Sequence, residues 1–106
     1  MSVITQSLRT FVNVAASATA SSVVAAVPGK VIRVLGVVFV AGGTATNATF
    51  NSASAAISCL FANAANGGAV LPYAEQGWFQ TVPGEALTVT TGAGATTGIQ
   101  IIYSLV

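Results

Sequence analysis

Charged side chains are scarce in this chain, and histidine is absent. The 106 residues include three Lys or Arg and two Asp or Glu, 5% of the chain, whereas about one quarter of a typical soluble domain is charged. Without histidine, Ser-His-Asp and Cys-His catalytic arrangements are excluded. Three basic residues are too few for the patch that nucleic-acid binding requires. We therefore expect no enzyme, no nucleic-acid partner and no small-molecule substrate.

Groups that hold metals or form cross-links are also nearly missing. Cys59 is the one cysteine, so it cannot close a disulfide within the chain or build a zinc site without histidine partners. A strand over residues 57–61 would make Cys59 a small buried side chain. Glu75 and Glu85 follow loop-like and turn sequences, and nothing places them together as the carboxylate pair of a glycosidase. The sequence predicts no cofactor and no metal.

Long hydrophobic runs are missing too, although 54% of the residues are hydrophobic. The best run, residues 34–41, is far shorter than the roughly 20 residues of a membrane span. An apolar stretch near the N-terminus is short and interrupted by Asn13, so we expect neither a signal peptide nor a transmembrane segment. A net charge of +1 gives little repulsion between molecules. This composition is typical of a subunit that its neighbours cover.

Short runs rich in Val, Ile, Thr and Phe, bounded by Gly, Pro, Asn and Ser, make up most of the chain. They predict strands rather than helices. The expected strands are residues 9–16, 20–27, 30–41, 44–51, 55–62, 68–73, 77–81, 85–91 and 98–105. The fold class is all-β: one compact antiparallel β-sandwich or jelly roll of about eight strands over residues 9–106, preceded by an extended N-terminal arm over residues 1–8. In the last two strands, Leu87 and Val89 share one face opposite Thr88 and Thr90, and Ile99, Ile101, Tyr103 and Leu105 share another.

Turn chemistry separates the runs. Residues 27–30 and 82–85 both read Val-Pro-Gly followed by a charged residue. Pro-Gly fits the two central positions of a type II turn, because Pro presets φ and Gly adopts positive φ. The glycine-rich residues 92–98 lack the spacing and the lysine of a phosphate loop, and we expect a loop between the last two strands.

The run over residues 30–40 is apolar on both sides. Simple alternation places Val31, Leu35, Val37 and Phe39 on one face and Ile32, Val34, Val38 and Val40 on the other. A strand that is apolar on both faces needs cover on both. In a thin sandwich the second cover comes from a loop, an arm or another subunit, so this run predicts oligomerisation.

Further contact candidates lie in the arm and in an aromatic cluster. They are Val3, Ile4, Leu8, Tyr73, Trp78 and Phe79. Trp and Tyr concentrate at binding hot spots, but Trp78 or Phe79 would equally serve to close one end of the sandwich core. A subunit contact and a glycan site are the alternatives.

Several stretches resemble small β-sandwich proteins of tailed bacteriophages, of the capsid decoration or cement type. They are residues 27–35, 42–46, 65–73, 77–79 and 84–87, and the resemblance covers roughly residues 20–106. It implies a structural virion protein on the outer surface of the head. Such proteins bind the major capsid protein, associate as homotrimers or dimers, and bridge neighbouring capsid subunits without catalysis.

Two other classes of function stay open. One is the glycan- or receptor-binding head domain of a phage fibre or other appendage, which would present Tyr73 or Trp78 on an open face. The other is a homopolymer such as a tail-tube or pilus subunit.

Overall fold

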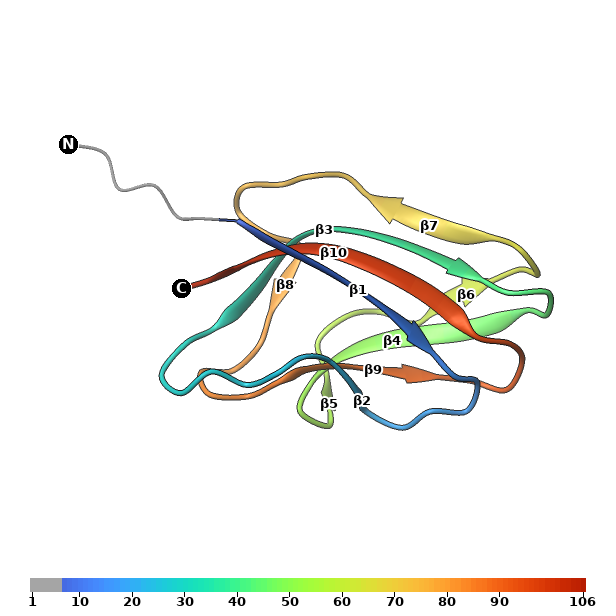
Figure 1. Cartoon of the computed structure of the whole chain (residues 1–106), viewed down its shortest axis with the longest axis horizontal. Coiled ribbons are helices and arrows are strands. Elements are labelled where there is room, and N and C mark those ends of the chain that lie inside the picture. The colour runs from blue at the N-terminus through green and yellow to red at the C-terminus, as the bar shows by residue number, and fades with distance from the viewer. Residues whose placement is uncertain (1–6) are drawn as a thin grey trace.

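The β-prone runs form ten strands in two antiparallel sheets. The computed structural model describes residues 7–106, and this part of the chain contains no helix. One sheet contains β1 (Leu8–Val14), β10 (Thr97–Leu105), β3 (Ile32–Ala41), β7 (Gly68–Leu71) and β8 (Phe79–Gln80). The other contains β2 (Ser21–Val24), β9 (Leu87–Thr91), β4 (Thr46–Ser52), β5 (Ala55–Ala56) and β6 (Phe61–Asn63). Figure 1 shows the two sheets stacked as layers.

The strand order is that of a jelly roll. The sheets run β1-β10-β3-β7 and β2-β9-β4-β6, so β1 pairs with β10, β2 with β9, β3 with β7 and β4 with β6. The two shortest strands extend this pattern, because β8 pairs with β3 beyond β7 and β5 pairs with β4 beyond β6. The expected all-β sandwich of about eight strands is confirmed.

The core lies between the sheets and is filled by alternate residues of the longer strands. Val37 and Phe39 on β3 face Phe50 on β4, and the Phe39 ring meets the edges of Phe50 and Phe61 at centroid distances of 6.0 and 4.8 Å. Leu87 and Val89 are fully buried, as their alternation with threonine predicted. Burial of these side chains is the main source of the sandwich's stability.

A β-bulge at Leu35 changes which residues of β3 face the core. In the pairing with β10, Gly36 lies opposite Ile102 and Val34 lies opposite Tyr103, which leaves Leu35 as an extra residue. Such a bulge shifts the alternation by one position. Ile32 and Val34 therefore join the core, together with Val37, Phe39 and Ala41. The prediction that Ile32 and Val34 share a face with Val38 and Val40 is wrong.

Both Pro-Gly turns form as predicted. Lys30 N donates to the Val27 carbonyl at 3.1 Å, and Glu85 N donates to the Val82 carbonyl at 3.1 Å. Gly29 and Gly84 have φ of 72° and 80°, the positive value that a type II turn requires. The turns also meet, because Gly84 N donates to the Lys30 carbonyl at 2.9 Å.

Hydroxyl groups bond the backbone where charged groups are absent. Thr91 Oγ1 accepts from Ala18 N at 3.0 Å and donates to the Ala15 carbonyl at 2.6 Å. Thr81 Oγ1 accepts from Ile32 N, and Ser52 Oγ accepts from Val82 N. Unpaired backbone groups are costly when buried, so these hydroxyls stabilise the fold; that of Ser52 also donates to the Glu85 carboxylate.

One expected strand is wrong. Residues 55–62 form β5 and β6, and residues 57–60 between them are not in a strand. Here Ile57 N donates to the Phe50 carbonyl at 2.9 Å, and the Ser58 hydroxyl accepts a hydrogen bond from Phe50 N, also at 2.9 Å. The chain bends at this point, and Cys59 is exposed. The prediction of a buried Cys59 is therefore wrong as well.

At the N-terminus, Leu8 is the first residue of β1, where it pairs with Tyr103. Val3 and Ile4, the other contact candidates of the expected arm, lie outside the described residues. Within residues 7–106, no helix has the length and apolar character needed to cross a bilayer.

Candidate functional site: the outer face of the β1-β10-β3-β7 sheet

The outer face of the β1-β10-β3-β7 sheet is apolar. The register aligns Phe11, Gln100, Val38 and Val70 in one row across the four strands. Phe11 is 72% exposed and Val70 is 64% exposed, while Val38 and Val40 are both more than two-fifths exposed. We call this surface the apolar face and define it by Phe11, Val38, Val40, Val70 and Ile102. Exposed apolar area of this kind marks interaction sites.

The opposite outer face, on the β2-β9-β4 sheet, is polar but uncharged. Its outward residues that reach solvent include Ser22, Asn47, Thr49 and Thr90, while Asn51 and Thr88 on the same side are buried. Some of these are internally bonded, as Asn51 Nδ2 donates to Thr90 Oγ1 at 2.9 Å. Hydroxyl and amide groups are well hydrated, so this face suits contact with water. The two outer surfaces of the sandwich thus differ in polarity.

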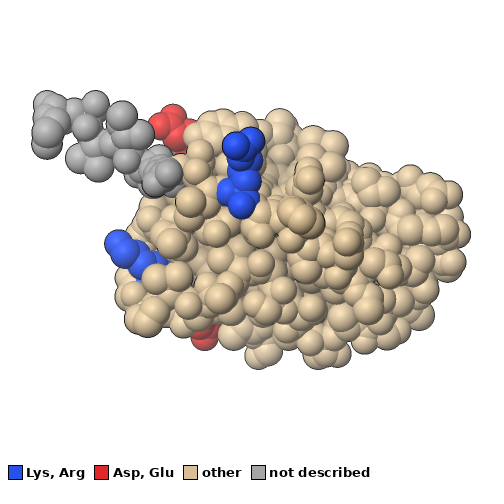
Figure 2. Space-filling model, in the orientation of Figure 1, with Lys and Arg blue, Asp and Glu red and all other residues tan. Residues whose placement is uncertain are grey.

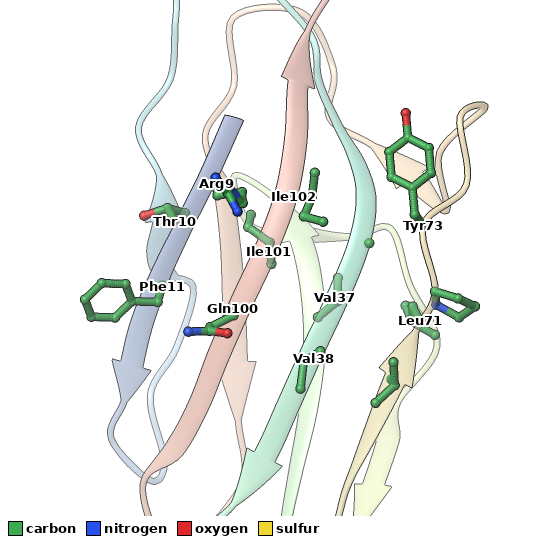
Figure 3. A pocket seen from close by; sticks show the side chains of 13 residues that line it. Arg9, Thr10, Phe11, Val37, Val38, Leu71, Tyr73, Gln100, Ile101 and Ile102 are labelled. Atoms are coloured by element: carbon green, nitrogen blue, oxygen red, sulfur yellow. The ribbon is translucent and has the colours of Figure 1, made fainter. Parts of the chain in front are cut away.

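Two hollows indent the apolar face, one on each side of a ridge. Phe11, Gln100 and Val38 line both hollows, so their row forms the ridge. The larger hollow, about 440 Å³, contains Gly36 and Ile102 and is flanked by Arg9 and Tyr73. The smaller, about 310 Å³, contains Gly98 and Val40. Figure 3 shows the larger hollow with Phe11 and Tyr73 on opposite sides and Ile102 and Val38 between them.

The glycines in these hollows leave the surface open. Gly36 lies where a Cβ atom would stand 3.3 Å from the Leu71 carbonyl oxygen. At Gly98 the nearest atom to such a Cβ is Asn13 Oδ1 at 3.4 Å. A larger side chain at either position would fill the hollow beside it.

The predicted aromatic cluster is divided between core and surface. Phe79 is half-buried and stacks on Phe50 at a centroid distance of 5.2 Å, so it closes part of the core. Trp78 is 46% exposed, and its Nε1 donates to the Pro72 carbonyl at 2.7 Å. Tyr73 is 60% exposed and flanks the larger hollow. Of these three aromatic residues, Tyr73 is therefore the one that lies beside the apolar face.

The charged groups lie away from most of this surface. In Figure 2 those on the visible face gather in its left half, and the right half shows none. Glu85 accepts a hydrogen bond from the Ser52 hydroxyl at 2.5 Å, and Arg33 Nε donates to Gln80 at 3.1 Å. Glu75 is exposed in the turn before β8. Residues 7–106 contain no group of three His, Cys, Asp or Glu side chains placed to hold a metal.

Sequence reasoning found part of this surface and missed the rest. The outward side of residues 30–40 was a predicted contact, and Val38 and Val40 lie there. Phe11, Ile102 and Val70 were not predicted as contacts. No protein-family model matches the chain, and a search of curated proteins finds no match either.

Proposed function

We propose that the chain is a structural virion protein, a capsid decoration protein that self-associates and bridges neighbouring major capsid subunits on the outer surface of a phage head. The observation that carries this proposal is the difference between the two outer faces of the sandwich. A subunit that self-associates on a shell needs one side for other copies of itself and another side that stays in water. The apolar face and the hydroxyl- and amide-lined opposite face supply these two surfaces.

The energetics of burial favour such a role. Each Å² of apolar surface removed from water contributes roughly 25 cal/mol before the costs of association. With five charged side chains in 106 residues, the chain has little else with which to attract a partner. Weak contacts repeated around a shell also reinforce one another through multivalency.

The test is to mix purified protein with capsids of its own phage that lack it, and to image them by cryo-electron microscopy. We expect regular additional density on the outer surface. Attachment should persist in 1 M NaCl, where the Debye length falls to about 3 Å and exposed charge–charge attraction is screened. Bare capsids at saturating protein would refute the proposal, and release by salt alone would refute its apolar basis.

The larger hollow favours a second candidate function, the glycan-binding head domain of a virion appendage. Tyr73 offers an exposed aromatic ring at this hollow, and Arg9 and Gln100 offer hydrogen-bonding groups. Aromatic rings and such polar groups together are suited to saccharides. A glycan array followed by titration of any hit against Tyr73→Ala protein tests this candidate, and an array without hits removes it.

A further inference from the structure

We infer that a second copy of this chain covers the apolar face, in a two-fold arrangement that seats the ridge of each copy in the larger hollow of the other. This inference rests on the self-association included in the proposed function, and it identifies the surface and the symmetry of that contact. The ridge is the row Phe11–Gln100–Val38, and the larger hollow is the one that contains Gly36 and Ile102.

Shape is the first argument for a second copy. The ridge and the hollow are adjacent rows of one sheet, because Phe11 and Arg9 are two residues apart on β1, as are Gln100 and Ile102 on β10. Rows so spaced lie about 7 Å apart along the strands. A two-fold axis that lies between the two facing sheets, parallel to the rows and midway between ridge and hollow, brings each ridge over the partner's hollow. Contacts of this kind are isologous, since each copy gives and receives the same surface.

Charge is the second argument. Interface cores are depleted of charged residues, and Arg9 is the one charged side chain among the described residues lining either hollow. A charged partner would find no complement here, whereas a second copy presents an equally uncharged apolar surface. The arrangement also brings the partner's Phe11 ring to the hollow that Arg9 flanks, and a guanidinium group is attracted to an aromatic face.

Area is the third argument. Three strands over the seven residues of β1, together with the four residues of β7, spaced about 4.8 Å apart, span about 400 Å² in projection. Two copies would therefore bury about 800 Å², below the roughly 1,000 Å² of a stable specific interface and in the range of weak, transient association. We expect a dimer that forms fully only where the protein is concentrated, as on a shell.

Sedimentation velocity over about 1–500 µM protein tests the inference. We expect native protein to pass from one copy to two, with a limiting mass of two chains, in both 0.1 and 1 M NaCl. Val38→Asp places a carboxylate in the middle of the ridge and should weaken association at least tenfold. The matched control is Thr49→Asp, which replaces another β-branched residue on the outer face of a central strand, but on the opposite sheet. It should leave association unchanged.

Phe11→Ala is the second ridge variant, and it avoids the risk that Val38→Asp disturbs the fold. Phe11 is largely exposed on an edge strand, so its truncation should not affect folding, yet it should weaken association about tenfold. Circular dichroism and melting temperature verify that each variant is folded.

Three results would overturn the inference. They are native protein that stays monomeric at every concentration, a limiting mass of three or more chains, and Val38→Asp or Phe11→Ala protein that associates no more weakly than Thr49→Asp protein. Imaging of capsids separates this inference from the proposed function. Protein that self-associates and decorates capsids, but whose association Val38→Asp and Phe11→Ala leave unchanged, would refute the inference alone. Dimeric protein that does not bind capsids would refute the capsid role alone.

Discussion

Thr91 offers a direct test of the idea that hydroxyl groups replace charge in holding this fold together. Its hydroxyl accepts from Ala18 N and donates to the Ala15 carbonyl, which ties the β1–β2 connection to β9. Thr91 is 4% exposed. Replacement by valine keeps the shape of the side chain and removes both hydrogen bonds.

The expected loss follows from the surroundings of the two orphaned groups. Ala15 is exposed, so water can replace the lost donor at its carbonyl. Ala18 is half-buried and packs against the core, so its N–H loses a partner that water replaces poorly. A buried donor without a partner costs about 1–3 kcal/mol, and we expect Thr91→Val to lower the free energy of unfolding by about 1–2 kcal/mol. That is a sizeable part of the roughly 5–15 kcal/mol that stabilises a domain of this size.

Urea unfolding monitored by circular dichroism measures the loss in the free energy of unfolding. In thermal unfolding, the melting temperature should fall by about 5–15 °C. Thr96→Val is the control, because Thr96 is exposed in the β9–β10 loop. It should change the free energy of unfolding by less than about 0.5 kcal/mol. Hydrogen exchange at the Ala18 amide should accelerate only in Thr91→Val. If both variants matched native protein within error, the argument from hydroxyl groups would be refuted.

Three further predictions concern the core, a close approach of two strands, and pH. Phe39→Ala, which removes a fully buried ring from the aromatic cluster, should cost about 3–5 kcal/mol in urea unfolding. Gly68→Ala should cost about 1–3 kcal/mol and speed exchange at the Val70 amide, because its Cβ would overlap the Phe39 carbonyl; unchanged exchange would contradict this. The free energy of unfolding should be flat between about pH 5.5 and 7.5, since the chain lacks histidine, the side chain that ordinarily titrates there. A slope in that range would show a coupled ionisation that this reasoning omits.

Local chemistry accounts for most of the fold that the sequence predicted. The Pro-Gly pairs at 28–29 and 83–84 specify their turns because the φ values that these residues favour are the ones required. The alternation of Leu87 and Val89 with threonine indicates a strand with these two residues on one face, and both lie in the core, although Thr88 and Thr91 are buried as well. The division into runs and turns, and hence the sandwich class, follows from features within a few residues of one another.

The bulge at Leu35 could not be predicted in this way. It arises from the pairing of β3 with β10, whose two strands lie far apart in the sequence. From simple alternation, both faces of β3 were apolar and each appeared to need burial against another part of the structure. The bulge turns Ile32 and Val34 into the core and leaves Val38 and Val40 as the residues that need an external cover.

The exposed site was hard to predict for a related reason. Phe11, Val70 and Ile102 lie on three different strands, and only the register brings them onto one surface. The bend at residues 57–60, which exposes Cys59, likewise depends on hydrogen bonds to Phe50 on β4. The register joins strands that are distant in the sequence, and the bend depends on bonds to a residue seven and eight positions earlier, so neither follows from the alternation of neighbouring residues.

The pairing of β1 with β10 also has a consequence for how the protein is made. A ribosome delivers the first strand long before the last, and β1 has no sheet partner until residues 97–105 have been synthesised. Pairings this distant close slowly, on the scale of milliseconds to seconds. Until then, Phe11 and Val12 and the open hydrogen-bonding edge of β1 are available to other nascent chains. A chain with so little charge has few means to repel them, so we expect its yield in the cell to fall steeply as its rate of synthesis rises.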